Sequence, residues 1–208
     1  MFTVSRYTNM LFSQTQTIDE KCLQLYDGRA GQGKKADFAL SFSPQHPGVW
    51  KHYDQLKSPG HEVPTLSQMS DISTSHLGLY LGAEVKKPSG NENEAKGQLF
   101  TWLGSKIIKQ RQVLSQNAPS QPIPETTMPL VGYTVVGYRW EFYIAYGHGN
   151  KDTDDIHILG PLPGLNIGTS SYLEAFKLLQ FDECVNKWAK DTCWPWFRDK
   201  IMESLKSN

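Results

Sequence analysis

The sequence lacks the features of secreted, membrane-embedded or zinc-stabilised proteins. Its three cysteines, Cys22, Cys184 and Cys193, are an odd number at spacings of no metal motif, so neither a disulfide framework nor a structural zinc site is expected. No apolar run reaches the roughly 18 residues of a membrane helix, and the N-terminus holds no signal-peptide core. We therefore expect an intracellular protein, cytoplasmic or nuclear, without a membrane segment.

The chain also lacks an excess charge of either sign. Its 21 Lys and Arg residues balance 21 Asp and Glu residues, which excludes a purely electrostatic nucleic-acid binder but allows a local basic patch. The 208 residues, 38% of them apolar, are enough for one core. We expect a single domain over residues 1–208, with a loop-like insert rich in proline and histidine at about 43–68.

What is present is a series of strand and helix patterns. Alternation of apolar and polar residues predicts strands at 22–26, 36–42, 76–87, 130–146 and 156–159, with a bend or bulge at Gly137. Helical periodicity predicts one helix at 92–116 and a second from Ser170 to Asp191, which Pro195 interrupts. This order favours an α/β or α+β fold, a mixed central β-sheet flanked by α-helices.

The sharpest chemical feature is the Glu84-Val85-Lys86 segment at the end of a predicted strand. Residues two apart on a strand face the same side, so Glu84 and Lys86 should project together. A carboxylate suits Mg²⁺, and an adjacent lysine can orient water and stabilise charge on a phosphate. A second acid is needed for the metal, and Asp37, on a preceding strand that could pair with this one, is the natural candidate.

These residues also have ordinary interpretations. A Glu-x-Lys pair on a strand is more often a solvated ion pair or a guard of a sheet edge. Asp37 favours function somewhat more, because it lies within an apolar strand where an acid is unusual.

Four segments together change this balance. They are KKADFAL with Asp37, SDISTSHLGLYLGAEVKK with Glu84 and Lys86, NEAKGQLFTWLGSK with Gln98, and a C-terminal part. The C-terminal part contains Gly137 with Trp140, the Gly168–Ser170 turn, Trp188-Ala189 and Pro195-Trp196. In this order the segments resemble the fungal PD-(D/E)XK nuclease-like domain family, over residues 34 to 204. That family implies a restriction-endonuclease-like core.

The resemblance implies a metal-dependent nuclease site. Asp37 and Glu84, with the main-chain carbonyl of Val85, would bind Mg²⁺ or Mn²⁺, and Lys86 would position the attacking water. Gln98 would support the site from the helix. Lys35, Lys87 and Lys96 cluster around these residues and are candidates for contacts with nucleic acid. Residues 1–12 lack the acid that many superfamily members carry before the first strand, which argues against a second metal ion.

The expected function is therefore hydrolysis of phosphodiester bonds by a metal-activated water, with DNA as the substrate. Two alternatives stay open: a catalytically silent module of the same fold that binds nucleic acid or protein, and a toxin-like nuclease with the same chemistry. The residues do not separate DNA from RNA or endonuclease from exonuclease. A homodimer is expected only by analogy with nucleases that cut both strands of a duplex.

Overall fold

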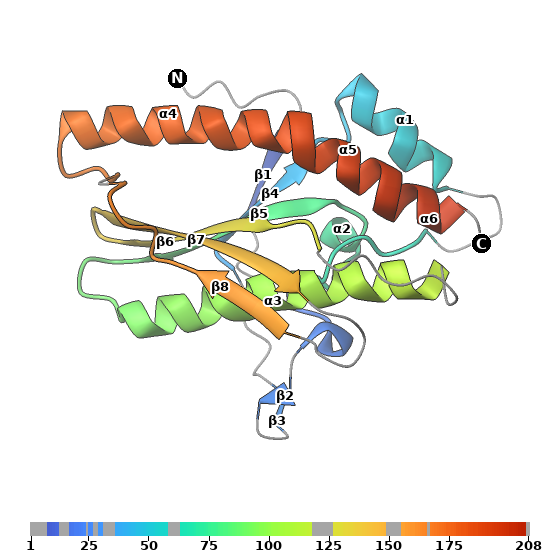
Figure 1. Cartoon of the computed structure of the whole chain (residues 1–208), viewed down its shortest axis with the longest axis horizontal. Helices are drawn as coiled ribbons and strands as arrows, with labels where there is room; N and C mark the ends of the chain where they lie inside the picture. Colours follow the sequence, from blue (N-terminus) through green and yellow to red (C-terminus); the bar gives the residue numbers. More distant parts are fainter. Residues whose placement is uncertain are drawn as a thin grey trace.

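A computed structural model shows a mixed six-stranded sheet at the centre of the molecule (Figure 1). The structure describes residues 8–12, 17–23, 25–26, 29–30, 36–57, 63–117, 127–148, 155–165 and 167–206. The sheet consists, in spatial order, of β1 (Thr8–Phe12), β4 (Phe38–Phe42), β5 (Leu79–Lys86), β6 (Leu130–Val136), β7 (Arg139–His148) and β8 (Asp155–Leu159). A separate small hairpin joins β2 (Leu25–Tyr26) and β3 (Arg29–Ala30).

Helices cover both faces of this sheet. The long helix α3 (Glu92–Asn117) lies along one face, and α4 (Tyr172–Trp188) lies along the other (Figure 1). This is the predicted architecture of a mixed sheet flanked by helices. The shorter helical segments are η1 (Glu20–Cys22), α1 (Pro47–Gln55), α2 (Ile72–Ser75), η2 (Ala189–Cys193), α5 (Trp194–Trp196), η3 (Phe197–Met202) and α6 (Glu203–Lys206).

The strand directions explain the position of α3. β5 and β6 are parallel neighbours, whereas the other neighbouring pairs in the sheet are antiparallel. A parallel pair needs a crossover connection, and α3 provides it between these two strands. The first turn of α3 consequently lies over the end of β5, where the predicted catalytic residues are found.

Two glycines of the sheet set how closely α3 approaches. A Cβ atom on Gly82 of β5 would lie 2.5 Å from the ring of Trp102, and one on Gly132 of β6 would lie 2.9 Å from Leu103. Trp102 and Leu103 are fully buried on α3, so these contacts anchor the helix on the sheet. A larger residue at either glycine would lift α3 away from β5 and β6.

The insert at 43–68 differs from its prediction. It was expected to be a loop because of its prolines, but it contains α1. Pro47 occupies the first turn of α1, where its missing N–H is not needed, and His46 caps the helix by accepting a hydrogen bond from the N–H of Gly48 at 3.1 Å. Proline density was therefore a misleading signal here.

The segment 130–146 is a hairpin rather than one bent strand. Gly137 adopts a φ of +61° and turns the chain between β6 and β7. Its N–H donates to the carbonyl of Lys86 at 3.1 Å. This bond holds the hairpin turn against the end of β5, at the rim of the candidate site.

Two further segments differ from the prediction. The strand expected at 22–26 is reduced to Leu25–Tyr26, because Asp19 caps the 3-10 turn η1 by accepting from the N–H of Lys21 at 3.0 Å. Pro195 does not end the last helix, since the π-helical turns η2 and η3 flank it and shift the hydrogen-bond pattern around its missing N–H.

The expectations about membrane helices and disulfides concern features of the described ranges. Within these ranges, no helix is long and apolar enough to cross a membrane. The three cysteines are free, with Cys22 and Cys193 buried and Cys184 exposed.

Candidate active site

Glu84 and Lys86 lie together on the face of β5 that α3 covers. Their side chains form an ion pair, with Lys86 Nζ 2.9 Å from Glu84 Oε1. The Glu84 side chain is only 2% exposed, and that of Lys86 is 22% exposed. The spacing of two residues along the strand places both on one side, as the sequence indicated.

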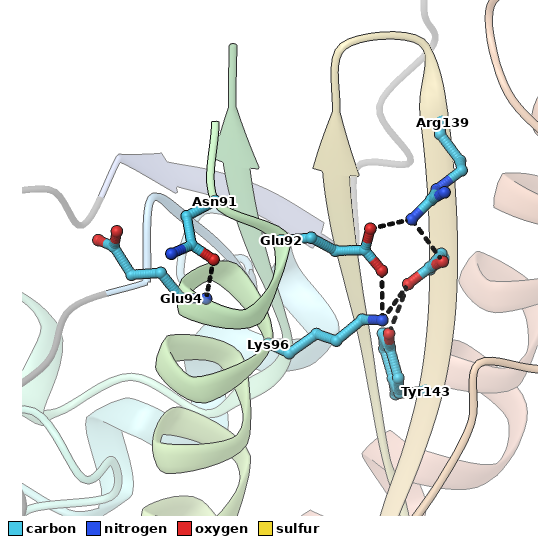
Figure 2. A network of polar contacts seen from close by, with 7 residues as sticks. Asn91, Glu92, Glu94, Lys96, Arg139 and Tyr143 are labelled. Carbon is cyan, nitrogen blue, oxygen red and sulfur yellow. Dashed lines mark hydrogen bonds and ion pairs between the residues drawn. The ribbon is translucent and has the colours of Figure 1, made fainter. Parts of the chain in front are cut away.

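The first turns of α3 provide further partners for Lys86. Its ammonium donates to Gln98 Oε1 at 2.7 Å and lies 3.5 Å from Glu94 Oε1. Asn91 caps the start of this helix, and its Oδ1 accepts from the N–H of Glu94 at 3.1 Å (Figure 2). Lys86 is thus held between one strand and one helix. Glu94 was not among the site residues predicted from the sequence.

Asp37 lies directly before β4 and reaches the same place. Phe38 pairs with Ala83 in the antiparallel register of β4 and β5, which puts Asp37 beside Glu84. Its Oδ2 accepts a hydrogen bond from the N–H of Val85 at 2.8 Å. The structure therefore brings Asp37, Glu84, Val85, Lys86 and Gln98 together. With Glu94, we call the side chains Asp37, Glu84, Lys86, Glu94 and Gln98 the Lys86 cluster.

Glu84 is the member of the Lys86 cluster with incomplete hydrogen bonding. Its Oε2 is buried, and no hydrogen-bond donor for it is found in the described part of the chain. Burial, together with the charge of Asp37, raises the pKa of Glu84 to about 7, although Lys86 and the backbone N–H of Asp37 lower it. A buried carboxylate with one unsatisfied oxygen is costly, and a cation at Oε2 would relieve that cost.

Lys86 itself stays a cation. Burial lowers the pKa of its ammonium, but hydrogen bonding to Glu84 and the charges of Glu84, Glu94 and Asp37 outweigh burial, so the pKa is raised. This side chain is therefore suited to donate hydrogen bonds and stabilise negative charge, not to accept a proton.

A second group of charges lies on the other side of the first turns of α3 (Figure 2). Lys96 pairs with Glu92 and lies 3.1 Å from Glu141 on β7, whereas Arg139 pairs with the same two acids, 3.1 Å from Glu141. Each charge thus has two partners of opposite sign. We call Glu92, Lys96, Arg139 and Glu141 the charge quartet. Tyr143 adds a hydrogen bond to Glu141 at 2.8 Å.

Strand register relates the two groups. Glu84 on β5 pairs with Thr134 on β6, which pairs with Glu141 on β7. The Lys86 cluster and the charge quartet thus occupy one row of the sheet beneath α3. Alternation along a strand puts Arg139 and Glu141 on one face, but only the pairing of strands shows that this face meets α3.

The residues predicted to contact nucleic acid have different positions. Lys87 is exposed after β5, and no ion pair involving it is seen in the described residues. Lys96 belongs to the charge quartet. Lys35 lies outside the described residues. The roles predicted for Lys87 and Lys96 stay predictions.

The described ranges contain no group of three or more His, Cys, Asp or Glu side chains placed to hold a metal ion. A site here would depend on the two carboxylates of Asp37 and Glu84 with other oxygens. Such a set suits Mg²⁺, which is often bound through one or two carboxylates and keeps several water molecules.

A mixed sheet between helices, with an acid before one strand and Glu-x-Lys at the end of the next, defines a restriction-endonuclease-like α/β protein. The model of the PD-(D/E)XK nuclease superfamily matches residues 3–194. No curated protein and no solved structure matches the chain. The chain belongs to the PD-(D/E)XK nuclease superfamily, and this membership suggests that it is a nuclease.

Proposed function

We propose that the chain is a nuclease that needs a divalent metal ion and hydrolyses phosphodiester bonds of DNA. The observation that carries this proposal is the buried Glu84 carboxylate, with Oε2 unsatisfied among the described residues, beside the fixed ammonium of Lys86. The expectation of DNA rests on the family resemblance.

The residues fit Mg²⁺ or Mn²⁺. Asp37 and Glu84 would hold the ion with carboxylate oxygens, the ligands that these hard cations prefer. The N–H of Val85 points to Asp37, and in a strand the N–H and C=O of one residue point to the same side, so the Val85 carbonyl would be the third protein ligand. When bound, such an ion lowers the pKa of a coordinated water and stabilises charge on a phosphate oxygen.

Local charge supports the need for a cation. The Lys86 cluster contains three acids, Asp37, Glu84 and Glu94, and one base. Without a further positive charge, this surface would repel the phosphodiester that it is proposed to bind. A divalent ion would reverse the sign of the local field.

Lys86 would orient the attacking water and stabilise negative charge on the phosphate. Its bonds to Glu84 and Gln98 are short, whereas its contact with the half-exposed Glu94 is 3.5 Å. The proton directed toward Glu94 is therefore the one available to water or substrate. Gln98 would act as a positioning residue, because it fixes the ammonium from α3.

The test is cleavage of supercoiled plasmid DNA and of RNA with Mg²⁺, Mn²⁺ or EDTA. We expect nicking of DNA with either metal, no nicking in EDTA, and at least a hundredfold less nicking by Glu84→Gln or Lys86→Met. Glu92→Gln, the same type of change in the charge quartet, should retain activity. If the folded wild-type chain cleaves nothing with either metal, the proposal is wrong, and the silent interaction module becomes the better interpretation.

A further inference from the structure

A cavity of about 510 Å³ lies next to the exposed edge of β7. β8 pairs only with residues 144–148 of β7, and Arg139 forms an isolated bridge with Gly168, so residues 140–143 have no strand partner on that side. The cavity is bounded there by residues 161–165 and 167, which follow β8, and by Ser170 and Glu174 next to and within the first turn of α4. The Lys86 cluster contributes no residue to it.

Two hydrogen bonds keep this cavity open. The N–H of Leu162 donates to the carbonyl of Phe142 at 2.9 Å, and the N–H of Thr169 donates to the carbonyl of Tyr138 at 3.2 Å. Leu162 and Thr169 are thus attached to β7 on either side of Trp140, and the cavity lies between these two points. Trp140 forms part of the wall in this gap.

The indole of Trp140 is an unused donor. Its Nε1 is buried, and no acceptor for it is found among the described residues. A buried N–H without an acceptor costs about 1–3 kcal/mol, so a ligand acceptor that reaches Nε1, once a neighbouring side chain moves aside, would be stabilised. The indole also stacks on Tyr133 at 5.1 Å between centroids, which fixes the ring.

The other walls favour a flat, polar-edged ring. Tyr138, Trp140 and Phe142 supply aromatic groups, and Leu162 and Pro163 supply an apolar wall. On the remaining side, the Glu174 carboxylate is held in place through Oε2 by the N–H and hydroxyl of Ser170. A nucleobase matches this set, because its face stacks on aromatic rings while its edge both accepts and donates hydrogen bonds.

The charges disfavour an anionic ligand. Arg139 lines the cavity, but it is paired with Glu92 and Glu141. Glu174 adds a negative charge. A base could therefore enter while its phosphate stays outside.

The distance from β5, which carries Glu84 and Lys86, to the cavity suits a nucleotide near the cleavage point. β7 is two strands from β5, so the cavity lies at least about 10 Å from β5 at the usual strand spacing, or the rise of about three nucleotides in a duplex strand. Trp140 and Glu141 are neighbours on β7, so their side chains point to opposite faces. A base could reach the indole only by leaving the stack and passing around the β6–β7 turn.

We infer that this cavity binds one nucleobase turned out of the nucleic acid near the scissile phosphate. The inference rests on the proposed nuclease function for its biological context, but not for its test. The probes are the neutral nucleosides adenosine, guanosine, cytidine and thymidine, and the readout is the NMR signal of the Trp140 indole N–H, assigned by its loss in Trp140→Phe.

We expect at least one nucleoside to shift the Trp140 signal in a saturable manner. Leu165→Trp, which fills the cavity from its rim, should weaken this binding at least tenfold, and Glu174→Gln should weaken it severalfold for the base that donates to the carboxylate. Tyr172→Ala, a change at a position of α4 that is 89% exposed and does not line the cavity, should bind as the wild type does. Thermal unfolding checks that each variant is folded.

The outcomes separate this inference from the proposed function. If none of the four nucleosides shifts the Trp140 signal at millimolar concentration, the cavity is not a nucleobase site, whether or not the chain cleaves DNA. If Leu165→Trp binds as well as the wild type, the inference is also wrong. A shift in a chain that cleaves nothing would support the cavity and reject the nuclease.

Discussion

The Lys86 cluster and the charge quartet lie on either side of the same two turns of α3, yet they differ in how their charges are satisfied. In the charge quartet, two acids and two bases pair in a closed ring. In the Lys86 cluster, three acids share one base, and a buried carboxylate oxygen has no hydrogen-bond donor among the described residues. The closed ring is typical of a structural contact, whereas the incomplete cluster is typical of a site that awaits a ligand.

The largest expected effect on cleavage comes from changing Glu84, whose Oε2 lacks a hydrogen-bond donor among the described residues. Glu84→Gln should lower the rate of DNA cleavage by about a thousandfold or more, because it removes a charged metal ligand. The same change should leave the melting temperature equal or higher, since it removes a buried charge that the fold does not fully pair. Plasmid nicking and thermal unfolding measure the two effects. A variant that loses activity only because it unfolds would contradict this account.

A smaller loss is expected when the ammonium is removed. Lys86→Met should reduce the cleavage rate by about a hundredfold to a thousandfold, in the range of one electrostatic group. Lys86→Arg should not restore it, because the planar guanidinium cannot occupy the compact position between Glu84 and Gln98. Single-turnover rates at saturating Mg²⁺ provide the measurement. Activity in Lys86→Met close to wild type would disprove the role of the lysine.

Gln98 should matter less, since it contacts Lys86 and not the substrate. Loss of the 2.7 Å hydrogen bond in Gln98→Ala should cost about 1–1.5 kcal/mol, or about tenfold in kcat with little change in KM. Gln98→Glu keeps an acceptor for the ammonium and should recover part of the rate. If Gln98→Ala raised KM alone, Gln98 would bind substrate rather than position Lys86.

The smallest expected effect concerns the two described lysines predicted to bind nucleic acid. Lys87→Met should make the negative slope of log K against log salt shallower by about 0.9, the value for one lost phosphate contact in duplex DNA. Lys96→Met should change the slope less, because Glu92 and Glu141 already engage its ammonium. Binding of a labelled duplex at several salt concentrations, in EDTA, measures both. Equal changes would mean that Lys96 leaves the charge quartet when DNA binds.

The contrast also shows what sequence patterns could predict. Alternation along β5 is a local signal, and it was enough to place Glu84 with Lys86. The position of Gln98 came from the family resemblance. Helical periodicity counts only apolar residues, yet a lysine also occupies a core position of α3: Lys106 is buried, with its ammonium donating to the carbonyl of Leu66 at 2.9 Å. Burial lowers the pKa of Lys106 to about 7.

The parts that could not be predicted depend on contacts between distant segments or on the position of single residues. The charge quartet requires the parallel register of β5 with β6, which no local pattern contains. The turn at Gly137 was hidden because both flanking strands have the same composition. Helix α1 was missed because a proline at its first turn looks, in sequence, like a proline that breaks a helix.

The most direct test of the central claim is the binding of Mn²⁺ followed by electron paramagnetic resonance, with no substrate present. The account predicts that the wild type and Glu92→Gln bind Mn²⁺ with the same affinity, whereas Glu84→Gln loses most of this affinity. Both substitutions neutralise one glutamate beneath or at the start of α3, so they differ only in which of the two charged groups they change. Equal Mn²⁺ binding by Glu84→Gln and the wild type would contradict the claim that the Lys86 cluster is a metal site.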